Sequence, residues 1–183
     1  MSPLPRPKTA RYGPKDRYDP PPAAGFCISV FAVLRRRGKL LAGRARMGPR
    51  WRDEWLPSIR SYAPAEQREV AAQWRLPGAY LLEGEHPERA LARVMRTQLG
   101  IRAYRIKSLS VGSWTAKSDW YPGHRHWDLG FVYEVAAEPA KRTPRWWEEL
   151  DWFGPADLRK LDFGWSDDLV RELAPTPPRR KRR

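Results

Sequence analysis

Three glutamates, Glu83, Glu85 and Glu88, lie close together in the stretch 76–101. Carboxylate oxygens are the ligands that Mg²⁺ prefers in proteins, and a bound divalent cation can activate water for hydrolysis. The same acids would also be stabilising as solvent-exposed groups near the positive end of a following helix. The sequence therefore leaves two interpretations open, a single weakly held cation or a purely electrostatic contribution to the helix.

A helix that follows these acids would hold them in place. It is expected from about Pro87 to Leu99, because proline suits the first helical turn and Gly100 can adopt the left-handed conformation that ends a helix. Apolar residues recur there at helical spacing and predict a buried stripe: Ala90, Leu91, Val94, Met95 and Leu99. Three arginines lie off that stripe: Arg89, Arg93 and Arg96.

This stretch resembles the Nudix box, a motif that reads glycine, five residues, glutamate, seven residues, then Arg-Glu-apolar-any-Glu-Glu-any-Gly-apolar. With the closing pair on Gly100 and Ile101, the isolated glutamate is Glu85 and the arginine is Arg93. The box then spans residues 79–101, with Ala79 at the position of the opening glycine. The resemblance implies that Glu85 and Arg93 occupy catalytic-motif positions, the arginine bracing the glutamate.

The box is degenerate at three positions, where the family's glutamates are replaced by Val94, Thr97 and Gln98. In the family those helical glutamates hold divalent cations on a nucleoside diphosphate. Their spacing of i, i+3 and i+4 places them on one side of a helix, and here that side carries no carboxylate. We therefore expect a protein that binds a nucleotide, a nucleoside diphosphate derivative or RNA, with hydrolysis weak or lost.

The alternative is an active, divergent pyrophosphohydrolase. It would use Mg²⁺ or Mn²⁺ held by Glu85 and its acidic neighbours to attack a diphosphate linkage with a metal-bound water. The two classes differ in their dependence on metal, because turnover requires the cation and binding does not.

The resemblance extends over residues 24–174 and implies an α/β/α sandwich around a mixed β-sheet, in a single α/β domain. Apolar and β-branched runs predict strands, and capping patterns predict the later helices. The expected strands are 25–34, 39–46, 104–114, 127–136 and 146–153, the expected helices are 155–161 and 166–173, and a turn is expected at Pro77 and Gly78.

Residues 47–73 form an insertion between the second strand and the box. Two tryptophans, Trp51 and Trp55, lie there among the arginines Arg50 and Arg52. Such residues could stack on a base and clamp phosphates, which makes them candidates for substrate binding. The alternative is that the tryptophans pack on the sheet and supply buried area.

A second candidate site is the sequence HRHWD, in which His124, His126 and Asp128 alternate. In an extended segment the three side chains would share one face, and imidazole with carboxylate suits zinc or manganese. One histidine could instead act as a general base. The alternative is an ordinary loop or strand edge, because such short patterns often arise by chance.

Composition bounds these hypotheses. The chain has 183 residues, a net charge of +14 and 19 prolines, many of them near the N-terminus. Residues 1–23 are expected to form a proline-rich basic disordered arm without the apolar run of a secretory signal, and residues 175–183 a basic disordered tail. The tail arginines and lysine, residues 179–183, could hold nucleic acid or another anionic partner weakly.

No stretch of the sequence is apolar enough for a transmembrane helix, and the single cysteine, Cys27, lies in the first expected strand. A cytoplasmic protein with a buried thiol is therefore expected. A homodimer is possible, because many Nudix proteins are dimers.

Overall fold

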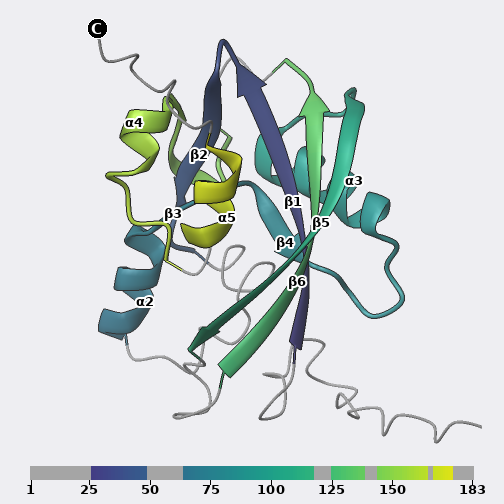
Figure 1. Cartoon of the computed structure of the whole chain (residues 1–183). Coiled ribbons are helices and arrows are strands. Elements are labelled where there is room, and N and C mark those ends of the chain that lie inside the picture. Colours follow the sequence, from purple (N-terminus) through teal and green to yellow (C-terminus); the bar gives the residue numbers. More distant parts are fainter. Residues whose placement is uncertain (1–25, 49–63, 118–124, 139–143, 165–166, 175–183) are drawn as a thin grey trace, which may run out of the picture.

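The computed structural model describes residues 26–48, 64–117, 125–138, 144–164 and 167–174. Seven strands form one mixed sheet in the order β3-β2-β1-β6-β5, while β4 pairs with β1 and β7 pairs with β2 (Figure 1). The strands are β1 (Phe26–Arg36), β2 (Lys39–Ala45), β3 (Trp74–Arg75), β4 (Gly78–Tyr80), β5 (Arg105–Lys117), β6 (Arg125–Ala136) and β7 (Trp147–Phe153). Only β1 and β6 run parallel among these pairs.

The first two strands form a tight hairpin. Arg36 pairs with Lys39, which leaves a loop of Arg37 and Gly38 with φ angles of 49° and 75°. Two positive φ angles are what a hairpin turn matched to the right-handed twist of the strands requires, and Gly38 adopts its positive φ without strain. The strands expected over 25–34 and 39–46 are therefore joined by a two-residue turn, and the first strand extends to Arg36.

Helices cover both faces of the sheet. Alternate residues of β1 point to opposite faces, so Val30, Ala32 and Leu34 pack with α3 (Pro87–Leu99). Phe31 and Val33 pack instead with residues of α4 (Pro155–Leu158) and α5 (Asp167–Leu173). The expected α/β/α sandwich is confirmed, with α3 on one side of the sheet and α4 and α5 on the other (Figure 1).

The remaining helix, α2 (Pro64–Ala72), lies within the segment expected to be an insertion. Its Val70 and Ala71 are buried with Trp146 and Trp147 near the end of β2. Within the part of the chain that the structure describes, no helix is both long and apolar enough to cross a membrane.

The turn expected at Pro77 and Gly78 is wrong for its second residue, because Gly78 begins strand β4. Gly78 pairs with Phe31, and a Cβ at this glycine would lie 2.8 Å from the Val30 carbonyl oxygen. The glycine therefore serves a close approach of two strands rather than a turn. The helix expected over 155–161 is also shorter, ending at Leu158. Ser166, the first residue of the helix expected over 166–173, lies outside the described residues.

Candidate functional site

Helix α3 is fixed at both ends by local contacts. The side chain of His86 caps the N-terminus, its Nδ1 accepting a hydrogen bond from the Glu88 amide at 3.3 Å. Gly100 ends the helix in the left-handed conformation, with φ of 67°, and its N–H donates to the Met95 carbonyl. The expected bounds of the helix are confirmed, so the residues of the box are placed in a defined register.

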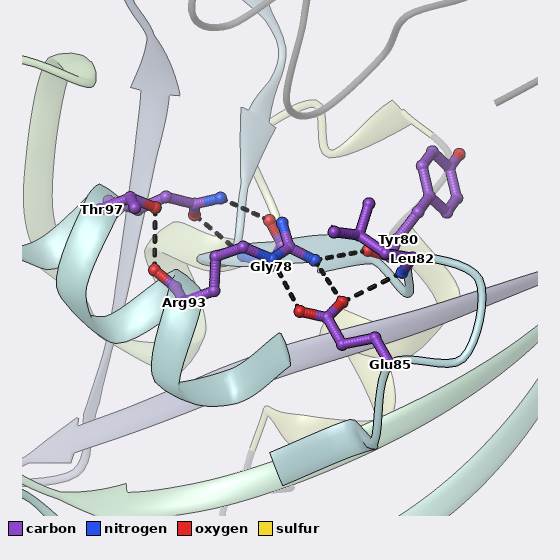
Figure 2. Close-up of polar contacts among 7 residues, drawn as sticks. Gly78, Tyr80, Leu82, Glu85, Arg93 and Thr97 are labelled. Carbon is purple, nitrogen blue, oxygen red and sulfur yellow. Dashed lines mark hydrogen bonds and ion pairs between the residues drawn. The ribbon is translucent and has the colours of Figure 1, made fainter. Parts of the chain in front are cut away.

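An ion pair joins the loop before α3 to the helix itself. The guanidinium of Arg93 donates from Nε to Oε1 of Glu85 at 3.0 Å and from Nη2 to Oε2 at 2.7 Å (Figure 2). Nη2 also donates to the Tyr80 carbonyl at 2.9 Å, and the Leu82 amide donates to Oε2 of Glu85 at 3.0 Å. Arg93 therefore ties the loop to both the end of β4 and the helix.

This pair is largely removed from solvent, with the side chains of Arg93 and Glu85 exposed by 19% and 12%. Burial alone would raise the pKa of Glu85, but the hydrogen bonds from Arg93 and the Leu82 amide, with the Arg93 charge, lower it overall. Glu85 is therefore a carboxylate at neutral pH, and both of its oxygens already accept hydrogen bonds.

Gln98 makes a second connection between α3 and β4. Its amide Nε2 donates to the Gly78 carbonyl at 2.6 Å, and its Oε1 accepts from the Gly78 amide at 3.1 Å. The indole of Trp147 donates to the Gln98 carbonyl at 2.8 Å. We call the two hydrogen bonds between the Gln98 side chain and Gly78 the amide clamp; Gln98 is only 2% exposed, so both bonds are shielded from water.

The other two degenerate positions differ from each other. Val94 is fully buried in the core cluster beneath α3. Thr97 is exposed, and its hydroxyl donates to the Arg93 carbonyl at 2.8 Å. The side of the helix that would carry metal-binding glutamates thus has the apolar side chain of Val94, the hydroxyl of Thr97, which bonds to the helix backbone, and the amide of Gln98, which forms the clamp. This donor set does not fit Mg²⁺ or Mn²⁺, which need oxygen ligands with negative charge.

The remaining acids near the box are dispersed. Glu83 is exposed. The pKa values of Tyr104 and Tyr133 are raised mainly by burial of these tyrosines and secondly by the charge of Glu88. Glu88 therefore lies on the β5–β6 side of the helix. Among the described residues, no three histidine, cysteine, aspartate or glutamate side chains come together as a metal-binding group. Glu83, Glu85 and Glu88 accordingly do not meet at one point in this structure.

Asp128, from the second candidate site, lies in β6 directly opposite Cys27 of β1. Its charge contributes to raising the pKa of both Cys27 and Tyr80, so it belongs to a polar cluster with these two residues. His126 lies in β6, but its side chain is outside the described residues, as is the whole of His124. The proposed histidine–aspartate site therefore stays a prediction.

The thiol of Cys27 provides a direct test of this cluster. Its pKa is raised to about 12, chiefly by burial and further by the charge of Asp128, while a hydrogen bond with Tyr80 partly offsets the increase. At pH 8 we expect iodoacetamide to alkylate the folded protein about a thousandfold more slowly than the unfolded chain, because only the thiolate reacts. Mass spectrometry with and without denaturant would measure this, and equal rates in the two states would show that the thiol is not shielded.

The four residues suggested for substrate binding, Arg50, Trp51, Arg52 and Trp55, lie outside the described residues. Sequence inspection missed the amide clamp. The glutamine at position 98 was the feature of the sequence that could have indicated the clamp. A side-chain amide has both a donor and an acceptor, so it can bond to the N–H and the C=O of a strand residue, whereas a carboxylate has no donor.

Comparison with known proteins identifies the fold and the family. No family model matches the chain. A protein of Mycobacterium tuberculosis named "Putative 8-oxo-dGTP diphosphatase 2" is 31% identical over 110 residues, which cover 57% of this chain and 74% of that protein. The chain belongs to the Nudix superfamily.

Solved Nudix structures share the fold. A MutT Nudix hydrolase from Burkholderia pseudomallei superposes with a TM-score of 0.52 at 19% identity, covering 80% of this chain and 96% of that one. The Nudix domain of NrtR from Shewanella oneidensis, solved with ADP-ribose, gives a TM-score of 0.52 at 13% identity, covering 89% and 91%. At these identities the likeness concerns the fold, and the chemistry must be argued from the residues of this chain.

Proposed function

We propose that this Nudix protein binds a nucleotide or a nucleoside diphosphate derivative at the loop and helix of its box, and that its hydrolytic activity is weak or lost. The amide clamp carries the proposal. In an enzyme that holds metal on this helix, position 98 would offer a carboxylate. Here position 98 is a neutral amide, and its donor and its acceptor both form hydrogen bonds with the backbone of Gly78.

Other contacts support a preserved binding scaffold. The Glu85–Arg93 pair keeps the box loop attached to α3, and Val94 fills the core where a second carboxylate would be needed. A ligand bound here would need this loop in a fixed position, and the contacts of Arg93 hold the loop without a cation. The aromatic and basic residues between positions 50 and 55 are candidates to hold the base and phosphates.

The alternative of an active pyrophosphohydrolase draws support from the 31% identity to the M. tuberculosis diphosphatase. In this hypothesis Glu85, whose Oε1 accepts only one hydrogen bond among the described contacts, would contribute an oxygen ligand to Mg²⁺ or Mn²⁺. The same hypothesis makes 8-oxo-dGTP the first substrate to test.

A phosphate-release screen distinguishes these functions. It would include 8-oxo-dGTP, nucleoside di- and triphosphates and ADP-ribose, with Mg²⁺, Mn²⁺ or EDTA, alongside thermal shift measurements on the same panel. We expect little or no metal-dependent turnover, and an increase in Tm by at least one ligand that persists in EDTA. At a ligand concentration of 100 times Kd, the stabilisation would be about 2.7 kcal/mol.

Glu85→Gln and Glu83→Gln form a matched pair for this screen, because Glu83 is an exposed acid in the same loop. Metal-dependent turnover that is lost with Glu85→Gln and kept with Glu83→Gln would replace the binding proposal with the enzyme. Absence of both turnover and thermal stabilisation across the panel would contradict both functions.

A further inference from the structure

A groove lies on the outer side of α3, where the chain returns along the helix after Gly100. It has a volume of about 430 Å³ and is lined by Ala92, Arg96, Ile101, Arg102 and Tyr104. We call these five residues the basic groove. The return of the chain is also evident at Tyr104, whose pKa is raised by burial and by Glu88 of the first helical turn.

The basic groove is separate from the amide clamp. Successive residues of an α-helix are rotated by about 100°, so Arg96 and Gln98 point to nearly opposite sides of α3. Gln98 is buried against β4, whereas Arg96 is exposed. A ligand in the groove would therefore contact neither Gln98 nor the interior of the box.

Positive charge accumulates along this groove. Arg89, Ala92 and Arg96 follow one another at i, i+3 and i+7, which places both arginines in one row on the outer side of the helix. Arg102, on the returning segment, lines the groove together with Arg96. None of the three guanidiniums forms an ion pair or hydrogen bond with another described side chain, and Glu88 is the acid whose charge reaches the Tyr104 end.

The floor and end of the groove add an apolar and aromatic surface. Ile101 is 5% exposed and belongs to the core cluster, and Tyr104 packs against that cluster while remaining partly exposed. Guanidinium groups bind phosphate oxygens through paired hydrogen bonds, and an aromatic ring supports stacking of a nucleobase. The volume is within the range of pockets for ligands of nucleotide size.

We propose that the basic groove binds a nucleoside phosphate, with Arg96 and Arg102 on the phosphate and Tyr104 against the base. The unit would come from a free nucleotide or from one residue of a single-stranded nucleic acid, which share this chemistry. The site is distinct from the one in the proposed function and from the C-terminal basic tail. It would give this Nudix fold a second contact with nucleotides on the solvent side of its box helix.

Fluorescence anisotropy tests the proposal with fluorescently labelled ADP and a labelled ten-nucleotide oligoadenylate, using the full chain in 0.1 M salt. The double variant Arg96→Gln and Arg102→Gln should weaken binding to this site about a hundredfold, at roughly tenfold for each guanidinium–phosphate interaction that is removed. Tyr104→Leu should weaken ADP binding but leave inorganic pyrophosphate, measured by competition, unchanged. Circular dichroism and Tm would confirm that each variant is folded.

The matched control is the double variant Arg159→Gln and Lys160→Gln, which removes the same charge from exposed residues after α4, on the other side of the sheet. It should leave affinity within twofold of wild type. A hundredfold loss for the oligonucleotide alone assigns the site to nucleic acid, and a loss for both probes assigns it to the nucleotide unit itself. The proposal would be overturned if the control variant lost as much affinity as the groove variant. It would also be overturned if poly-glutamate displaced the probes as effectively as pyrophosphate does, because binding would then reflect nonspecific charge.

Failure here is distinguishable from failure of the proposed function. Ligand stabilisation through the box should survive Arg96→Gln and Arg102→Gln, whereas binding in the basic groove should survive Arg93→Ala, which releases the box loop. Each site is thus tested in a variant that leaves the other intact.

Discussion

Gln98→Glu should destabilise the protein by about 3 kcal/mol at pH 7, although it restores the residue type that the Nudix box has at this position. The Gly78 carbonyl receives its hydrogen bond from the Gln98 amide nitrogen at 2.6 Å. A carboxylate has no hydrogen to donate, so the change sets two oxygens against each other in a site that is 2% exposed. Chemical denaturation in EDTA would measure the loss of stability.

The same variant has a characteristic pH dependence. A protonated carboxyl can donate to Gly78 as the amide does, so folding raises the pKa of the introduced group above its unfolded value of about 4.3. A raised pKa means that the lost stability is recovered below the unfolded pKa and disappears as pH rises through the folded one. The difference between wild type and variant should therefore be small at pH 4 and large at pH 7.

Thr97→Glu is the matched control, because it adds the same charge one residue away at an exposed position. We expect a change within about 0.5 kcal/mol and no comparable pH dependence. If Gln98→Glu were as mild as this control, the amide clamp would not explain the degenerate box, and a carboxylate at position 98 could hold metal on this helix at little cost to the fold.

The helix and its register could be predicted from the sequence because local signals agree. Pro87, Gly100 and the apolar spacing between them are sufficient to fix α3, and all are visible in the chain itself. The Glu85–Arg93 pair followed from the resemblance to the box and is present. Its additional bonds to Tyr80 and Leu82 depend on how β4 and the loop pack, which no local pattern encodes.

Strand β4 and the basic groove show where the sequence was insufficient. In the sequence, Gly78 beside Pro77 looks like a turn residue. Its pairing with β1 shows instead that the missing side chain allows two strands to approach closely. Arg96 and Arg102 are separated by the helix end, and their opposition arises because the chain reverses direction at Gly100. Both features come from tertiary contacts that override local propensity.

Arg93→Ala should cost about 3 kcal/mol and detach the box loop, because it leaves the Glu85 carboxylate buried without its partner. Three hydrogen bonds of Arg93 are removed together, two to Glu85 and one to the Tyr80 carbonyl. Stability would be measured by denaturation, and loop attachment by amide hydrogen exchange at Leu82 and Glu85. Ligand affinity at the box should fall in parallel, because the loop no longer has a fixed position.

The pH profile separates this ion pair from simple packing. The pKa of Glu85 is lowered in the folded state, so the pair contributes its full stability above the unfolded pKa of about 4.3 and loses it as pH falls through the folded value. The cost of Arg93→Ala should therefore shrink at acid pH. Glu85→Gln, which keeps the shape but removes the charge, should show a smaller loss of about 1–2 kcal/mol.

A double variant completes the test. If the pair acts as a unit, Arg93→Ala combined with Glu85→Gln should cost less than the sum of the single changes, because no buried charge then lacks a partner. Additive costs would mean that Arg93 and Glu85 stabilise the loop independently. An Arg93→Ala protein with wild-type stability and unchanged ligand affinity would show instead that the box loop is positioned by other contacts, and the retained arginine would then have no part in binding.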